Sequence, residues 1–306
     1  MHGYSWLLIA SIAPLLWATA NHIDKYLITK FGVGIGTKGL IIFSCLLSSI
    51  TVIVVSFFLP KTHILAFPTL NIIVLITTGI LWSLGILFYL FALGEDETSF
   101  VVAMFQLIPV FAFIMGFLFL GETISIRQII GALIIILGGI LVSLNFNEKF
   151  KFKKKLFILM VSSSFVIALS QILFKFAALD NFKGAMFWQY TGTLLLGLIF
   201  LCLPSFKKEF FSVFKNNLTG KIFFWSVMVE ILTLIGNSLV SFSVLIAPVA
   251  MVLLVESFQP ALSFILAIII TIFIPTFAKE DLSPKILFQK ITAIAIVLIG
   301  SAILFL

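Results

Sequence analysis

Long apolar stretches recur along the whole chain and constrain its fold more than any other feature. A helix needs roughly 20 apolar residues to cross the hydrocarbon core of a bilayer, which is about 30 Å thick. Of the 306 residues, 62% are apolar and only 10% are charged, whereas about 25% are charged in soluble domains. The sequence therefore predicts an all-α, multi-pass integral protein of the cell membrane (the inner or cytoplasmic membrane).

Short polar connections divide the apolar stretches into ten expected transmembrane helices. Their expected ranges are 4–28, 38–59, 69–93, 99–120, 126–144, 156–179, 185–203, 222–246, 249–274 and 286–306. Pro109 and Pro260 fall inside two of these helices, where each leaves a backbone carbonyl without its helical partner. A cavity or a neighbouring side chain must then satisfy that carbonyl.

Matching residues in the two halves predict an internal repeat. At shifts of 150 or 151 residues, the matched pairs are Lys25 with Lys175, Gly85 with Gly236, and Pro109 with Pro260. We therefore expect one five-helix repeat at residues 1–150 and a second at residues 151–306. Because five is odd, the second repeat enters the membrane from the opposite side, as in the inverted repeats that build alternating-access transporters.

Lysine residues are concentrated on one side of the expected membrane topology. Five of them lie within residues 147–155 alone. The positive-inside rule places this side in the cytoplasm and both ends of the chain outside. The acidic connection Glu95 to Glu97 falls on the same side and weakens this assignment. The net charge of +7 thus concerns membrane orientation, and we expect no nucleic-acid partner.

Glu256 lies inside the apolar stretch 249–274. A carboxylate at this depth costs several kcal/mol unless it is paired or protonated, so it is a candidate functional residue. On a helix, Glu256, Gln259 and Ser263 share one face. Our hypothesis is that a proton and a cationic substrate compete for the Glu256 carboxylate, which would couple transport to protons. The alternative is a structural carboxyl that hydrogen-bonds a neighbouring polar side chain.

Glu230 lies in a second polar stripe, on the expected helix 222–246. The stripe consists of Ser226, Glu230, Thr233, Asn237 and Ser241. Counted from the N-terminal ends of their helices, which lie at opposite faces of the membrane, Glu230 and Glu256 are each about 11 to 12 Å deep, so both approach the middle of the membrane. For Glu230 the same two alternatives hold, a functional carboxylate or a structural one.

Further candidates lie on the first, third, fourth and sixth expected helices. Aromatic side chains at helical spacing pack against neighbours or form a wall that binds a cation. Lys25 and Lys175 lie near helix ends, where they either extend to the membrane surface or bind an anion. The predicted substrate-binding residues are Trp17, Asn21, Asp24, Trp82, Tyr89, Gln106, Gln171, Lys175, Glu230, Asn237, Glu256 and Gln259.

The chain resembles the EamA-type transporters of the drug/metabolite transporter superfamily. The resemblance rests on residues 99–125, which include Leu120-Gly121-Glu122, on residues 128–139, and on residues 247–266 and 289–300. It implies a central cavity lined by the third, fourth, eighth and ninth helices, with the first and sixth nearby. It also implies export or exchange of small metabolites. The topology described for this family has cytoplasmic termini, opposite to the orientation that the lysines favour.

We therefore expect a secondary active transporter, an exporter or exchanger of a small polar, zwitterionic or cationic metabolite. The alternative is a carrier or flippase for a phosphorylated or lipid-linked substrate, bound by Lys25 and Lys175. An enzyme is disfavoured because the sequence has no HExxH motif, no metal-spaced histidines and no nucleophile-base pair. No cofactor or metal is expected. The expected partners are a small-molecule substrate and membrane lipid, and the expected state is a monomer or homodimer.

Overall fold

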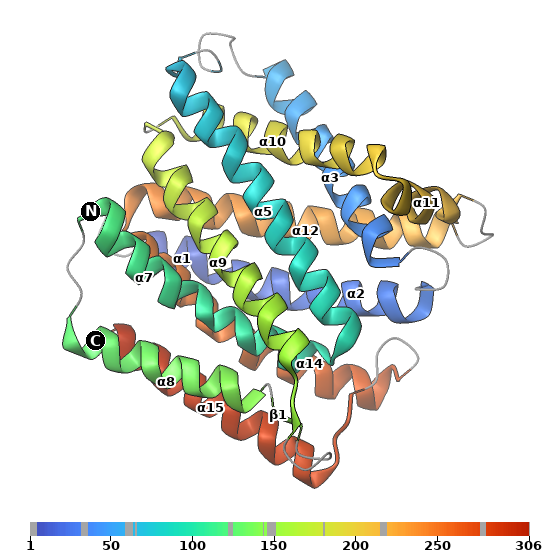
Figure 1. The fold of residues 1–306 in the computed structure, drawn as a ribbon, viewed down its shortest axis with the longest axis vertical. Helices are drawn as coiled ribbons and strands as arrows, with labels where there is room; N and C mark the ends of the chain where they lie inside the picture. Colours follow the sequence, from blue (N-terminus) through green and yellow to red (C-terminus); the bar gives the residue numbers. More distant parts are fainter. Residues whose placement is uncertain are drawn as a thin grey trace.

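The computed structural model describes residues 5–31, 36–58, 64, 66–121, 125–142, 144–145, 151–179, 181–214, 219–275 and 280–305, and these are almost entirely helical (Figure 1). The helices of the first half are α1 (Ser5–Ser11), α2 (Ala13–Phe31), α3 (Gly36–Phe58), α5 (Thr69–Glu95), α6 (Thr98–Ala103), the 3₁₀ turn η1 (Met104–Gln106), α7 (Leu107–Leu120) and α8 (Ile126–Val142).

The helices of the second half are α9 (Lys154–Ala177), α10 (Phe182–Cys202), α11 (Pro204–Val213), α12 (Thr219–Ile246), α13 (Val249–Val255), the 3₁₀ turn η2 (Glu256–Phe258), α14 (Gln259–Phe273) and α15 (Pro284–Phe305). A short antiparallel pair, β1 (Leu144–Asn145) and β2 (Lys151–Phe152), lies between α8 and α9.

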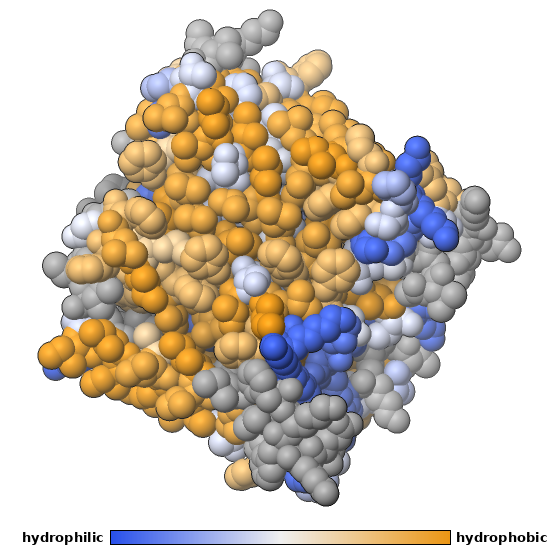
Figure 2. Space-filling model, viewed as in Figure 1, coloured by the Kyte–Doolittle hydropathy of each residue, from blue (hydrophilic) through white to orange (hydrophobic). Residues whose placement is uncertain are grey.

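Eight helical segments of the described chain are long and apolar enough to cross a membrane. They correspond to the expected spans except 126–144 and 249–274, where α8 and the α13–η2–α14 segment lie. Apolar side chains cover most of the visible surface, and hydrophilic residues gather at its lower and right-hand edges (Figure 2). Such a surface suits lipid contact, because lipid tails are as apolar as these side chains. The protein is therefore a multi-pass membrane protein.

Three of the expected helices are interrupted rather than continuous. The first is split at Ile12 between α1 and α2, and the other two contain η1 and η2. Each interruption lies just before a proline: Pro14, Pro109 or Pro260. Proline has no backbone N–H and its ring crowds the preceding turn, which explains the break. The amphipathic helix α11 also lies where only a connection was expected.

The acidic connection Glu95 to Glu97 is neutralised by lysines from other segments. Lys155 pairs with Glu95 and Lys153 with Asp96, both at 2.5 Å. The Lys290 ammonium, which is 1% exposed, lies 2.6 Å from Glu97 and 3.0 Å from Glu280. These pairs explain how three acidic residues sit on the lysine-rich side of the molecule.

The pairs around Lys290 also join the two halves of the chain. The Ser99 backbone N–H and hydroxyl both donate to the Glu280 carboxylate. Burial raises the pKa of the Glu97 carboxyl above its ordinary range, and Lys290 offsets this only in part.

Helices α5 and α10 approach one another backbone to backbone. A Cβ atom added at Gly79 would lie 1.8 Å from the Gln189 carbonyl oxygen, and one at Gly192 would lie 2.0 Å from the Ile76 carbonyl oxygen. Small residues permit such close packing in membranes, where dispersion contacts replace the hydrophobic effect. Glycine is therefore required at both positions of this crossing.

Candidate functional site

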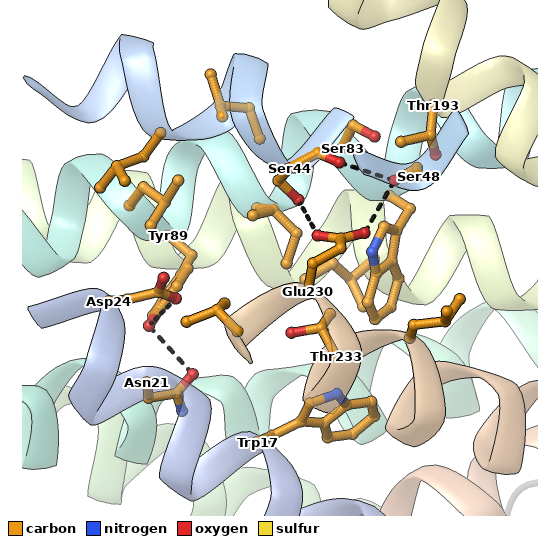
Figure 3. Close-up of a pocket in the computed structure, with 18 of the residues that line it drawn as sticks. Trp17, Asn21, Asp24, Ser44, Ser48, Ser83, Tyr89, Thr193, Glu230 and Thr233 are labelled. Carbon is orange, nitrogen blue, oxygen red and sulfur yellow. Dashed lines mark hydrogen bonds between the residues drawn. The ribbon is translucent and has the colours of Figure 1, made fainter. Parts of the chain in front are cut away.

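A cavity lies between the two halves, lined mainly by α2, α3, α5 and α12 (Figure 3). Residues from α9 and α10, and from the interrupted segments around η1 and η2, complete its wall. Eight of the predicted substrate-binding residues line it: Trp17, Asn21, Asp24, Trp82, Tyr89, Glu230, Glu256 and Gln259.

The Glu230 carboxylate projects from α12 towards two serines of α3 (Figure 3). The Ser44 hydroxyl donates to one carboxylate oxygen at 2.7 Å, and the Ser48 hydroxyl donates to the other at 2.9 Å. Two hydroxyl donors stabilise a carboxylate, but they leave its negative charge uncompensated. Glu230 thus bridges α12 and α3 at the edge of the cavity.

A second carboxylate, that of Asp24, lies beside Tyr89 and Asn21. The Tyr89 hydroxyl lies 3.2 Å from the Asp24 carboxylate and 3.1 Å from the Asn21 amide oxygen. Tyr89 is itself buried and packs against Phe105 with ring centroids 5.3 Å apart. The phenol therefore holds two acceptors of α2 in place from α5.

Glu256 is the third carboxylate of the cavity, and it differs from the other two. No side chain in the described part of the chain donates a hydrogen bond to its carboxylate, although the residue is only 6% exposed. Its backbone carbonyl is the one that Pro260 leaves without a helical partner. The Gln106 side-chain amide donates to this carbonyl at 3.1 Å. Gln106 therefore joins η1 to η2. It also provides the hydrogen bond expected from the sequence for the carbonyl that Pro260 leaves unpaired.

Aromatic rings form another part of the wall. Trp17 and Trp82 lie with ring centroids 6.3 Å apart, tilted by 40°. Gly236 of α12 accommodates Trp17, because a Cβ atom there would lie 2.7 Å from the indole nitrogen. The face of an indole attracts a cation within about 6 Å of the ring centroid. The cavity thus offers both carboxylates and aromatic faces.

Four of the predicted residues do not line the cavity: Gln106, Gln171, Lys175 and Asn237. The amide of Gln171 lies 3.4 Å from the Asn237 amide oxygen, and Asn237 in turn donates to the Tyr190 hydroxyl at 3.2 Å. Because Tyr190 does line the cavity, these two amides lie one layer behind its wall.

Lys25 and Lys175 bind the ends of helices. The Lys25 ammonium donates to the carbonyls of Leu93 and Asp96 at the end of α5, each at 2.7 Å. The Lys175 ammonium donates to the Ala247 carbonyl, just past the end of α12, at 2.8 Å. Cations are favourable at helix C-termini, where unpaired carbonyls carry partial negative charge. Neither lysine lines the cavity.

The described residues that line the cavity include three carboxylates and no lysine, arginine or histidine. The sequence did not identify several of the neutral polar residues among them, such as Ser44, Ser48 and Thr193. A signal for the two serines was present, since their spacing of four puts them on one helix face. Among the described residues, no group of three or more His, Cys, Asp or Glu side chains could hold a metal ion.

Comparisons with known proteins concern the fold and the family of the chain. A search of curated proteins by sequence finds no match. A solved structure, described only as "Crystal structure of protein", has a TM-score of 0.65 and 16% identity, and the alignment covers 98% of this chain and 96% of that one. At this identity the likeness concerns the fold. Residues 4–144 match the model of the EamA-like transporter family. This match covers a little under half of the chain, and over these residues the chain is similar to the membrane transporters of that family.

Proposed function

We propose that this protein is a secondary active exporter or exchanger of a small metabolite that carries an ammonium or similar cationic group. The observation that carries this proposal is the charge of the cavity, where Asp24, Glu230 and Glu256 face no basic residue among the described lining residues. Buried carboxylates are costly inside a membrane unless a cation or a proton compensates them. A cationic substrate supplies that compensation, and Trp17 and Trp82 would contact it through their ring faces.

Alternating access through two inverted five-helix repeats, residues 1–150 and 151–306, is the transport mechanism we propose. The lysine contacts support it, because the same contact occurs once in each half. Lys25 donates to the Asp96 carbonyl and Lys175 to the Ala247 carbonyl, and the two lysines and the two carbonyls are related by shifts of 150 and 151 residues. The 3₁₀ turns support it as well, since each lies just before one of the matched prolines. The two halves thus repeat both a helix-end contact and a helix break. The cavity between them is where inverted-repeat transporters bind substrate.

A phosphorylated or lipid-linked substrate receives no support from the cavity. Such a substrate would need cationic contacts, and the candidates for that role were Lys25 and Lys175. Both donate to backbone carbonyls at helix ends and do not line the cavity. A phosphate among three carboxylates would also be repelled by them.

Proton coupling is proposed to occur at Glu256. Asp24 and Glu230 receive hydroxyl donors, whereas no described side chain donates to the Glu256 carboxylate. A proton is therefore the simplest group to compensate Glu256 when substrate is absent. When a cationic substrate occupies the cavity, it favours the ionised carboxyl and releases the proton, so the two are exchanged by linkage.

A thermal-stability screen of the purified transporter tests the substrate class. A ligand that binds the folded state raises stability by mass action. We expect small amines to raise the melting temperature, and their N-acetylated counterparts, which carry no charge, to have no effect. Uptake of the active amines into proteoliposomes then establishes transport. Stabilisation by phosphorylated compounds, with amines inactive, would overturn the proposed function.

A further inference from the structure

We infer that the cavity is built for a dication, a linear molecule with two ammonium groups joined by an apolar chain. This inference rests on the proposed function and names the substrate class for the same site. It starts from the separation of two of the carboxylates: Glu230 with its serines and Asp24 with Tyr89 lie apart in the close-up, and the two clusters share no residue (Figure 3).

Each of the two clusters has the chemistry of an ammonium site. An alkylammonium group has three N–H donors and no acceptor. At one end, the oxygens of Glu230, Ser44 and Ser48 remain able to accept after the serines have donated to the carboxylate. At the other end, the acceptors are the carboxylate of Asp24 and the amide oxygen of Asn21, both already aligned by the Tyr89 hydroxyl. Both clusters are rich in hydrogen-bond acceptors. An ammonium group, which can only donate hydrogen bonds, requires such acceptors.

Apolar and aromatic side chains line the rest of the cavity. Trp17, Trp82, Ile86, Leu90 and Phe105 are among them. Each methylene group of such a chain gains free energy when it is buried against these side chains, because apolar surface leaves water. A hydrated or strongly polar linker would lose its water there without gaining partners. The lining therefore favours an apolar connection between the two cationic ends.

The number of carboxylates in the cavity also favours a ligand with two ammonium groups. A single ammonium group would leave two of the three cavity carboxylates uncompensated. Two ammonium groups compensate Asp24 and Glu230 and leave only Glu256, whose proton their charge displaces in the proposed exchange. A zwitterionic amino acid fits less well, because its carboxylate would find no lysine, arginine or histidine among the described lining residues.

The decisive experiment compares two series of ligands on the purified, full-length transporter. The first series is the α,ω-diaminoalkanes of increasing chain length, and the second is the n-alkylamines with the same numbers of carbons. Dissociation constants come from thermal stabilisation or calorimetry. We expect the diamines to bind about tenfold or more tightly than matched monoamines, because the second ammonium group adds charged hydrogen bonds that a monoamine cannot make. We also expect affinity to peak at one chain length, since the two sites lie at a fixed separation.

Two variants locate the effect. Glu230→Gln and Asp24→Asn should each abolish the preference for diamines while leaving monoamine binding through the intact site. Lys207→Gln, on the exposed face of α11, is the matched control and should keep the full preference. If these variants fold poorly, the ligand series on the unaltered protein still decides the question.

The possible outcomes separate this inference from the proposed function. If monoamines and diamines bind with equal affinity, or if diamine affinity depends on chain length only as monoamine affinity does, the dication inference is wrong. The proposed function, transport of a cationic amine, would still stand. Tighter binding of amino acids than of diamines would also overturn it. If amines of neither series bind, the proposed function fails together with the inference.

Discussion

Glu256 and Glu230 differ at the level of single residues, and this difference can be measured. Only Glu230 receives hydroxyl donors from neighbouring side chains in the described chain. We expect Glu256→Gln to abolish the dependence of transport on an imposed pH gradient, because glutamine keeps the shape but cannot titrate. Glu230→Gln should reduce substrate affinity and retain that dependence. Proteoliposome uptake at several external pH values makes the comparison. Continued accumulation by Glu256→Gln with only a pH difference imposed would show that Glu256 is structural.

Trp17 provides a second prediction at this scale. It lines the cavity and packs against Gly236 of α12. If its ring face contacts the substrate cation, Trp17→Ala should weaken binding by about 0.5 to 2 kcal/mol. Trp17→Phe should recover part of the loss, because an aromatic face remains. Calorimetric titration of both variants gives the answer, and equal losses in the two would show that the ring face makes no contribution.

Lys290 should be important for stability. Lys290→Met leaves Glu97 and Glu280 without their buried cation, and breaking a buried pair typically costs about 3 to 5 kcal/mol. The control is Lys155→Met, which removes the exposed pair with Glu95 and should change the free energy of unfolding by less than about 1 kcal/mol. Denaturant unfolding in detergent compares the two. Similar effects of both changes would mean that the Lys290 pairs contribute no more than a surface contact.

The crossing of α5 and α10 yields a prediction at the scale of the element. Gly79→Ala and Gly192→Ala place a methyl group within 2.0 Å of a carbonyl oxygen of the facing helix, so the helices must move apart and the melting temperature should fall. Gly94→Ala in the same helix is the control, because its nearest contact is an ordinary 3.9 Å to Thr37. That change should be neutral or stabilising, since alanine favours helix over glycine. Equal melting temperatures for all three variants would contradict the close packing.

Hydropathy predicted these elements well, whereas their interruptions and contacts needed the structure. Every expected span contains helix, because the length of each apolar stretch can be read from the sequence. Glu230 could be singled out from its own helix, but its partners Ser44 and Ser48 could not, because pairing across helices depends on packing. In the same way, Gln106 and Lys175 are polar residues in apolar helices, and both bind backbone carbonyls. The sequence alone cannot distinguish a polar side chain that binds a backbone carbonyl from one that lines a cavity.

Membrane orientation is a property of the whole molecule. The lysines of residues 147–155 favour a cytoplasmic location for this segment, which includes Phe150, a residue outside the part of the chain that the structure describes. A cysteine placed at Phe150 should therefore resist a membrane-impermeant thiol reagent in intact cells and react after permeabilisation. Exposed Cys202 is replaced by serine first, so that only the new thiol reports. Labelling in intact cells would reverse the orientation and agree with the topology described for the family.

The crossing at Gly79 has a consequence for the symmetry of the proposed transport cycle. In the proposed repeat, the shift that matches Gly85 with Gly236 also matches Gly79 with Glu230. At Gly79 the helices meet through bare backbone, whereas at Glu230 they meet through a carboxylate and two serines. The free energy of closure would then depend on bound charge on one side of the membrane and only on shape on the other. Such a carrier would bind a charged substrate with different affinity from the two sides of the membrane, while the gradients would still set the net direction of transport.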